Sequence, residues 1–298
     1  MQLPRRVALF LPLLALTAPR PAAAQSLPGT TDRYFVTSDN VRLHYFEAGP
    51  PTAHTIVFVP GWTMPAWIFA PQIRAFSRIY HVIAFDPRGQ GESEIAPSGY
   101  EPHRRGQDIA ELLAHLGPRP VLLVGWSLGV LDALAFVHTY GDSQLAGLVL
   151  IDNSVGEAPA PVPHPHLRRP PPPVSHEAYM EYFVRTMFHT PQSSAWLERL
   201  TEATLRTPDW AARLLLEYPV PRVYWREAIY ATRKPVLYAV RPGFAAQAAN
   251  LKRNRPNTET AVFRDAGHAL FIDDSARFNA LMQSFIQEMV WPKEAPRS

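Results

Sequence analysis

The sequence predicts an α/β protein whose mostly parallel sheet is covered by helices on both faces. Continuous apolar runs alternate along the chain with stretches that place apolar residues at helical spacing, a pattern typical of buried parallel strands. One run, Val121–Val124, leads into Gly125-Trp126-Ser127-Leu128-Gly129 and then into an apolar helical segment, Val130–Tyr140. The alternation stops between Asn153 and Arg233, which predicts an inserted subdomain.

Residues 1–24 of the 298-residue chain have the pattern of an export signal. Arg5 and Arg6 form a charged start, Val7–Ala18 supplies a short apolar core, and Ala22-Ala23-Ala24 is a small-residue cleavage site. The apolar run is too short to span a bilayer permanently. We therefore expect a periplasmic or secreted protein that keeps no membrane anchor after the signal is removed.

The net charge of the chain indicates which partners to expect, and its lack of cysteine limits the chemistry available to it. The formal net charge of +3 arises from the three arginines of the signal segment, so the remaining chain is close to neutral. A neutral chain gives no reason to expect a nucleic-acid or membrane partner. The chain has no cysteine, which excludes disulfides, thiolate nucleophiles and Cys-ligated metals. We expect a small-molecule substrate; the oligomeric state is left open.

The first half of the chain predicts a hairpin followed by alternating strands and helices. Ser38-Asp39-Asn40 forms the hairpin turn, and Gly117-Pro118 ends the helix before the Val121 strand. The expected strands cover Arg33–Thr37, Val41–Glu47, Thr55–Val59, His81–Phe85 and Val121–Val124, and the expected helices cover Pro65–Ser77, Gln107–Leu116 and Val130–Tyr140.

The second half completes the sheet. Strands are expected over Leu145–Ile151, Val236–Val240 and Thr260–Arg264, with a helix near Ala245–Asn250. The last helix, with Asp274-Ser275 as its cap, carries one apolar stripe. This stripe consists of Phe278, Leu281, Met282, Phe285, Ile286 and Met289. Residues 25–152 and 234–298 are therefore expected to form the core.

Residues 153–233 are expected to form a proline-rich segment and a helical cap. Prolines are dense from Pro159 to Pro173, which favours extended polyproline conformation. Within that tract, His164 and His166 are not interpreted as a metal site. Four short helices are expected to start near Ser175, Pro191, Pro208 and Pro221. The many aromatic residues of this region would pack the cap and line an apolar pocket above Ser127.

Strand, Gly-x-Ser-x-Gly turn and helix together predict a nucleophile elbow at Ser127. Gly125 and Gly129 lack a Cβ that would collide with the adjoining elements, and the amide of Leu128 would face a developing oxyanion. A serine needs a base to remove its proton, usually a histidine held by a carboxylate. His268, in the loop before the last helix, is the expected base, since the other candidate histidines lie in expected helices.

These motifs resemble those of the α/β-hydrolase family over about Arg33 to Trp291. The resemblance rests on the Ser127 elbow, Pro60-Gly61-Trp62, the glycine-dense Asp86–Ser93 turn and Ala266-Gly267-His268. It implies an α/β-hydrolase fold with an eight-stranded sheet, no cofactor, no metal, and chemistry on esters, lactones, amides or related bonds.

The resemblance also implies the chain order Ser, acid, His. Most relatives carry the acid after the penultimate strand, but here Arg241–Thr258 contains neither Asp nor Glu. Asp152 ends the strand after the nucleophile helix, where haloalkane dehalogenases place their carboxylate, and it is the expected acid. Glu157 is the second choice, and Asp265 is too close to His268 in sequence to reach behind its ring.

The remaining expected site residues lie near the elbow and the third strand. The amide of Trp62 is expected to join that of Leu128 in an oxyanion hole, and Trp126 and Met64 are expected to contact substrate. Haloalkane dehalogenases and epoxide hydrolases use an aspartate nucleophile, and Ser127 argues against both.

The sequence thus predicts an exported, cofactor-free serine hydrolase that cleaves ester or lactone bonds of apolar or aromatic small molecules. Two alternatives stay open. One is a cofactor-free perhydrolase or haloperoxidase-like enzyme that uses the same three residues with peroxide replacing water. The other is a non-catalytic, hydrolase-like protein that binds a small apolar ligand.

Overall fold

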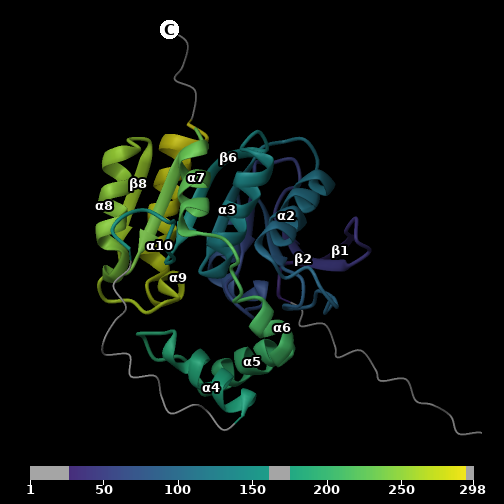
Figure 1. Ribbon diagram of the computed structural model, residues 1–298. Coiled ribbons are helices and arrows are strands. Elements are labelled where there is room, and N and C mark those ends of the chain that lie inside the picture. Colours follow the sequence, from purple (N-terminus) through teal and green to yellow (C-terminus); the bar gives the residue numbers. More distant parts are fainter. Residues whose placement is uncertain (1–26, 161–174, 293–298) are drawn as a thin grey trace, which may run out of the picture.

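An eight-stranded sheet lies at the centre of the protein (Figure 1). The computed structural model describes residues 27–160 and 175–292. Strand β2 pairs antiparallel with β1 and β4, and the remaining neighbours pair in parallel in the order β1-β2-β4-β3-β5-β6-β7-β8. The strands are β1 (Thr31–Val36), β2 (Arg42–Ala48), β3 (Thr55–Val59), β4 (His81–Asp86), β5 (Val121–Trp126), β6 (Leu145–Ile151), β7 (Val236–Val240) and β8 (Thr258–Val262). The expected fold class is confirmed.

The central strands are mostly apolar because both faces of the sheet are covered. Every residue of β3, β4, β5 and β7 is buried. The ends of β3, β6 and β7 coincide with those predicted from the apolar runs. Strand β8 begins two residues earlier than predicted, since Thr258 already pairs with Val236.

Helices cover the two faces of the sheet as separate layers. Ile109 of α2, Val130 of α3, Ile229 of α7 and Leu251 of α8 belong to the apolar cluster on one face. Helices α1, α9 and α10 pack into the cluster on the other face. The bounds are α1 (Ala70–Phe76), α2 (Pro102–Leu116), α3 (Leu128–Tyr140), α7 (Arg222–Ala231), α8 (Ala245–Asn254), α9 (Leu270–Asp273) and α10 (Ser275–Phe285). Shorter helical turns are η1 (Ala66–Phe69), η2 (Pro242–Phe244) and η3 (Ile286–Val290).

The cap consists of α4 (His176–Thr186), α5 (Ser194–Leu205) and α6 (Asp209–Leu214), which lie together below the core in Figure 1. Helix α7 instead packs against α3 and belongs to the core layer. The helical cap therefore ends earlier than the expected boundary at residue 233. The expected segment 1–24 and the residues His164 and His166 lie outside the described residues.

One of the four cap-region helix starts differs from prediction in an informative way. Helix α5 begins at Ser194, not at Pro191, because the Ser193 side chain accepts the Trp196 amide and caps the helix. Helices α6 and α7 begin directly after Pro208 and Pro221, which occupy their N-cap positions, close to the expected starts.

Side chains and carbonyls tie the cap to loops of the core. The Trp62 indole Nε1 donates to the Ala212 carbonyl at 2.7 Å, and the Thr207 hydroxyl donates to the Gly89 carbonyl at 2.7 Å. Within residues 27–160 and 175–292, no helix is both long enough and apolar enough to cross a membrane.

Candidate active site

Ser127 lies at the tip of the turn between β5 and α3, with φ 54° and ψ −117°. This positive φ is sparsely populated for a residue with a side chain. A Cβ on Gly125 would lie 2.3 Å from the Gly129 carbonyl oxygen, and a Cβ on Gly129 would lie 2.3 Å from the Val59 carbonyl oxygen. Because only glycine fits at both positions, strand, turn and helix pack closely enough to hold Ser127 in this conformation.

His268 reaches the serine from the loop between β8 and α9. Its Nε2 lies 2.8 Å from the Ser127 Oγ. Two hydrogen bonds fix this loop: the Trp126 indole donates to the His268 carbonyl at 2.9 Å, and the Gly267 amide donates to the Asp273 carboxylate at 2.7 Å. The backbone is therefore fixed both at His268 and at the residue before it, which limits the positions that the imidazole can take.

Asp152 follows the last residue of β6 and lies behind the imidazole. Its Oδ2 lies 2.7 Å from Nδ1 of His268. Its backbone also has a positive φ, 51°, and its side chain is fully buried. Burial alone would raise the pKa of Asp152, but the hydrogen bond from His268 and the charge and amide of Arg241 hold this pKa below its ordinary value.

The other two carboxylates considered from the sequence lie elsewhere. Glu157 is buried, but it accepts hydrogen bonds from the Tyr230 hydroxyl, the Asn250 side chain and the Ala158 amide. Asp265 is exposed. The structure therefore brings Asp152, and neither alternative, to His268.

The loop after β3 passes directly beside the serine. A Cβ on Gly61 would lie 3.0 Å from the Ser127 Cβ. Within the described part of the chain, no acceptor is found for the amides of Trp62, the next residue, and Leu128 at the start of α3. The geometry thus leaves both expected oxyanion donors available.

Gln90 braces this loop, a role that the sequence did not reveal. Its Oε1 accepts the Thr63 amide at 2.8 Å and its Nε2 donates to the Gly61 carbonyl at 3.2 Å. Thr63 itself has a positive φ of 58°. Gln90 lies in the Asp86–Ser93 turn and is almost fully buried. Its side chain supplies the hydrogen bonds to the loop that Pro60, which has no polar side-chain atom, cannot supply.

Arg241 and Asn153 are two further site residues that sequence reasoning missed. The Arg241 amide donates to Asp152 Oδ1 at 2.9 Å, and its guanidinium Nε lies 2.5 Å from Oδ2. The Asn153 side chain donates to the Ser127 carbonyl at 2.9 Å. Both residues lie just after the end of a strand. This position was the only sequence feature that could have indicated their place in the site.

The structure corrects the expectation that Trp126 and Met64 contact substrate. Trp126 is 1 % exposed and Met64 is 0 % exposed. The Trp126 ring packs edge-on against Phe271 while its indole N–H is used by the His268 carbonyl. Both side chains therefore support the site from inside the core.

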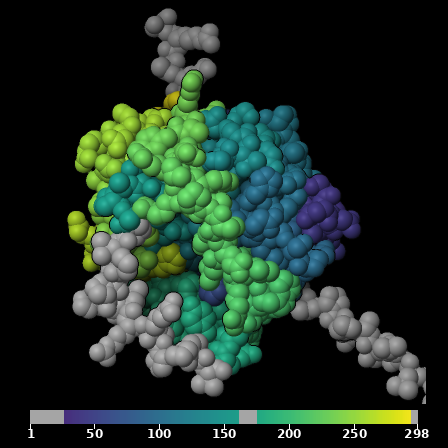
Figure 2. Space-filling view, in the orientation of Figure 1, coloured from purple at the N-terminus to yellow at the C-terminus, as the bar shows by residue number. Residues whose placement is uncertain are grey.

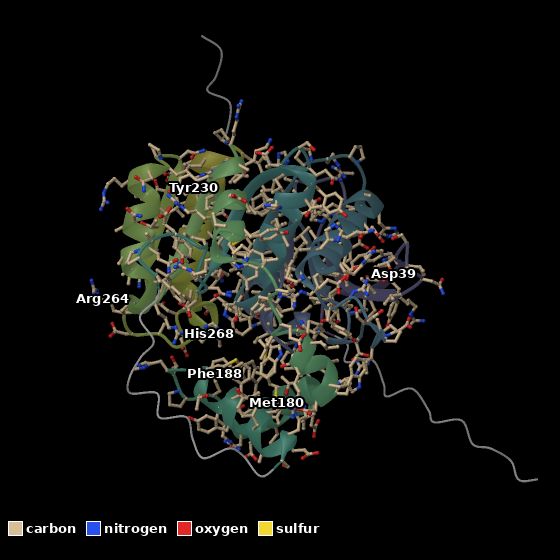
Figure 3. All side chains as sticks on the ribbon, in the orientation of Figure 1. Asp39, Met180, Phe188, Tyr230, Arg264 and His268 are labelled. Carbon is tan, nitrogen blue, oxygen red and sulfur yellow. The ribbon has the colours of Figure 1, made fainter. Side chains whose placement is uncertain are left out.

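The cap covers the histidine loop closely. Figure 3 shows His268 at the lower end of the core, next to Phe188 of the cap. The Ala269 amide donates to the Met187 carbonyl at 3.2 Å, and a Cβ on Gly267 would lie 2.4 Å from that same oxygen. The Asp273 carboxylate also accepts the amides of His189 and Thr190, so it joins cap and histidine loop.

A groove of about 470 Å³ opens between the cap and the loop after β3. Figure 2 shows a hollow between the cap helices and the core. The Trp62 ring forms part of its wall and packs against Tyr179 and Phe183 of α4. His176, Asp209 and Arg213 supply polar side-chain atoms to its lining. Among the described residues, no cluster of three or more His, Asp or Glu side chains is arranged to hold a metal ion.

The arrangement can move a proton from Ser127 to His268 while Asp152 stabilises the resulting charge. Hydrogen bonds of 2.8 and 2.7 Å link the three side chains in that order. The amides of Trp62 and Leu128, for which the described residues supply no acceptor, are the expected oxyanion donors. These features meet the geometric requirements for nucleophilic attack on a carbonyl.

Comparisons with known proteins agree with this fold. The alpha/beta hydrolase family matches residues 56–281. A non-heme haloperoxidase from Rhodococcus erythropolis is 34% identical over 119 residues, covering 39% of this chain and 43% of that protein. A soluble epoxide hydrolase from Corynebacterium sp. (strain C12) is 31% identical over 110 residues, covering 37% of each chain. The matched region thus spans about two fifths of the length of these curated relatives.

Solved structures show the same architecture over nearly the whole molecule. An esterase from Rhodococcus sp. ECU1013 superposes with a TM-score of 0.73 at 20% identity, covering 87% of this chain and 99% of that one. The family match, the order of the strands and the elbow at Ser127 lead to one conclusion. The chain belongs to the alpha/beta hydrolase family.

Proposed function

We propose that the protein is a serine hydrolase that cleaves carboxylic ester or lactone bonds through an acyl-enzyme on Ser127. The observation that carries the proposal is the continuous hydrogen-bonded series from Ser127 Oγ through both nitrogens of His268 to Asp152, with distances of 2.8 and 2.7 Å. A serine in this arrangement is activated for attack on a carbonyl carbon.

In acylation, Oγ attacks the carbonyl carbon as its proton passes to Nε2 of His268. Asp152 accepts a hydrogen bond from Nδ1–H, which sets the tautomer and stabilises the imidazolium. The amides of Trp62 and Leu128 stabilise the tetrahedral oxyanion. The imidazolium then returns its proton to the leaving alkoxide, and the alcohol departs.

In deacylation, water takes the place of the alcohol. His268 removes a proton from water as the oxygen attacks the acyl carbon, and the same two amides stabilise the second oxyanion. The proton then returns from Nε2 to Oγ, which releases the acid and restores Ser127.

The cap groove favours apolar or aromatic substrates of modest size. Trp62, Tyr179, Ala212 and Leu216 supply apolar wall area within a volume of about 470 Å³, which lies in the range of small-molecule sites. The backbone amide of Trp62 is also an expected oxyanion donor. Trp62 therefore connects the groove to the proposed reacting centre.

The nucleophile is tested with p-nitrophenyl esters and lactones of graded chain length. Ser127→Ala should abolish hydrolysis above background, whereas Ser284→Ala on the exposed face of α10 should retain it. Labelling by a fluorophosphonate probe should occur in the wild type and be lost only in Ser127→Ala. Wild-type rates in Ser127→Ala would exclude Ser127 as the nucleophile, and absence of labelling in folded wild type would favour a ligand-binding protein.

The acid is tested by two isosteric amides. Asp152→Asn should lower kcat by about 10³–10⁴, because the imidazole loses the partner that sets its tautomer. Glu157→Gln should change kcat little, since Glu157 bonds Tyr230 and Asn250 away from His268. The reverse ranking of the two variants would reassign the acid.

A second candidate function is perhydrolysis. It is favoured by the 34% identity to a non-heme haloperoxidase over 119 residues. In this reaction hydrogen peroxide replaces water as the nucleophile that releases the acyl group. Rates of acyl transfer to peroxide and to water, measured side by side in the same buffer with and without added peroxide, would distinguish the two activities.

We also propose that the protein is exported and that residues 1–24 form its signal. The support is the charged start, apolar core and small-residue site of that segment. N-terminal sequencing of protein recovered from the periplasm or medium should begin at Gln25. Recovery only inside the cell with an intact Met1 would contradict export.

A further inference from the structure

Arg241 shares a single carboxylate oxygen with His268. It begins the loop after β7, where its amide donates to Asp152 Oδ1 at 2.9 Å. Its Nε lies 2.5 Å from Oδ2, and Nδ1 of His268 lies 2.7 Å from the same Oδ2. A second guanidinium nitrogen, Nη2, lies 3.4 Å from Nδ1. A permanent cation is therefore placed directly beside the ring that must become charged.

We propose that Arg241 is a positioning residue that sets the lower pH limit of activity by opposing formation of the His268 imidazolium. The proposal rests on the proposed role of His268 as the base for Ser127. Two effects act in the same direction. The guanidinium repels the positive ring, and it takes up part of the accepting capacity of Oδ2 that would otherwise stabilise Nδ1–H.

The proton balance of acylation shows why this matters. The proton that leaves Ser127 Oγ arrives at Nε2 and leaves the ring with two N–H groups and a net positive charge. A ring that resists this charge stays neutral, and so remains a competent base, down to a lower pH. Nη2 can also donate to Nδ1 when the proton resides on Nε2, an arrangement in which the ring cannot act as base.

Other ionisable groups around the ring are directed elsewhere. From β7, the Tyr238 hydroxyl donates to the Asn153 carbonyl at 2.7 Å. From α9, the Asp273 carboxylate accepts the Gly267 amide and two cap amides. Arg264 and Asp265 are exposed, and Figure 3 shows Arg264 at the outer edge, apart from His268. Among the described residues, the charges in direct contact with the imidazole are thus those of Asp152 and Arg241.

The size of the effect is limited by solvent. The Arg241 side chain is 40% exposed, so water and salt screen its charge, while Asp152 is fully buried. We therefore expect Arg241 to move the acid limb of the activity profile by about one pH unit rather than several.

The test compares pH profiles of kcat/KM for one p-nitrophenyl ester in four proteins. Arg241→Gln removes the charge but keeps a polar side chain and the backbone donor to Asp152. Its acid limb should move up by about one pH unit. Arg241→Lys keeps a cation and should stay near wild type, and Arg264→Gln removes an exposed charge without changing the profile.

A role limited to holding the loop would lower kcat/KM equally at every pH, and an unmoved acid limb in Arg241→Gln would overturn the proposal. A second measurement is independent of turnover. The His268 imidazole is titrated by ¹⁵N NMR in wild type and in Arg241→Gln, and its midpoint should be higher in the variant. This readout separates failure of the present inference from failure of the proposed function, which the Ser127→Ala protein tests.

Discussion

Three residues of the candidate site hold left-handed backbone conformations: Thr63, Ser127 and Asp152. Such conformations cost on the order of 1–3 kcal/mol each for residues with a side chain. The surrounding hydrogen bonds hold each of them in place: the Thr63 amide binds Gln90, and the Asp152 amide binds the Ala239 carbonyl. Strain is thus concentrated at the proposed nucleophile, the proposed acid and the loop that carries a proposed oxyanion donor.

At Gln90, we predict that the side-chain hydrogen bonds, rather than its volume, keep the oxyanion loop in place. Gln90→Met preserves the volume but cannot accept the Thr63 amide or donate to the Gly61 carbonyl. We expect kcat to fall by about 10–10², which is less than the 10²–10³ typical for losing an oxyanion donor outright. Steady-state ester hydrolysis measures this, and a fully active Gln90→Met enzyme would show that packing alone suffices.

At Asp152, the lowered pKa predicts a component of acid stability. The folded protein holds this pKa below its ordinary value, so the unfolded chain binds the proton more readily. The carboxylate then stabilises the fold fully above about pH 4, and this contribution is lost as pH falls through the folded pKa.

Urea unfolding at pH 6 and pH 3 should therefore show a smaller loss of stability on acidification in Asp152→Asn than in wild type. Asp265→Asn, which alters an exposed carboxyl group, is the matched control. Equal losses in Asp152→Asn and wild type would mean that this carboxyl group has no part in acid unfolding.

Residues of the site differ in how visible they are in the sequence. Ser127 and His268 lie in local motifs, and Asp152 could be inferred because the loop after β7 contains no acid. Gln90 and Arg241 carry no such local signal. Their roles depend on contacts between loops far apart in the chain, from Gln90 to Thr63 and from Arg241 to Asp152.

At the scale of elements, the short helix α9 connects the cap to the histidine loop. Its last residue, Asp273, accepts three backbone amides, from Gly267, His189 and Thr190, at 2.7 to 2.9 Å. The next residue, Asp274, caps α10 by accepting the Arg277 amide and pairs with the Arg277 guanidinium at 3.9 Å. Asp273 thus binds the histidine loop and the cap, whereas the adjacent Asp274 stabilises the start of α10.

We predict different outcomes for alanine at these two positions. Asp273→Ala should lower the free energy of unfolding by about 2–3 kcal/mol, because it removes three hydrogen bonds that contribute about 1 kcal/mol each. It should also lower kcat, because the loop that carries His268 loses its contact with α9. Asp274→Ala should cost about 1 kcal/mol and leave kcat unchanged. Thermal unfolding and ester hydrolysis measure both, and equal effects on kcat would refute the connection through Asp273.

Elements were predictable where local pattern alone decides them. The limits of β3, β6 and β7 follow from uninterrupted apolar runs between turn residues. Helix α5 was misplaced because Thr190 is held by Asp273, a long-range contact, while Ser193 provides the cap. The assignment of α7 to the core depends on its packing against α3, which its own sequence does not specify.

At the scale of the whole molecule, a buried ion pair connects two core helices to the cap segment. Arg105 of α2 lies with its Nε 2.9 Å from Oδ1 of Asp132 of α3, and both side chains are almost fully buried. Arg105 also donates to the Leu215 carbonyl beyond α6 at 2.8 Å. Burial raises the pKa of Asp132 to about 6 even though the guanidinium favours the charged form.

We predict that removing one charge of this ion pair lowers the free energy of unfolding more than replacing both residues with apolar ones. Asp132→Ala leaves the guanidinium buried without its carboxylate and should cost about 3–5 kcal/mol of unfolding free energy. The double variant Arg105→Met with Asp132→Leu removes both charges and should be clearly more stable than Asp132→Ala. Urea unfolding of the single and double variants decides this, and a double variant no better than Asp132→Ala would contradict it.

Ser127 and Asp152 follow β5 and β6, two strands that pair directly in the middle of the sheet. The Ser127 amide donates to the Ile151 carbonyl, and the Asn153 side chain returns a hydrogen bond to the Ser127 carbonyl. Ser127 and Asp152 are thereby anchored to the buried centre of the sheet. Because the proposed acid follows β6, the segment after Arg241 does not have to supply it. We therefore expect changes of sequence or length in that segment to leave the proposed nucleophile in place.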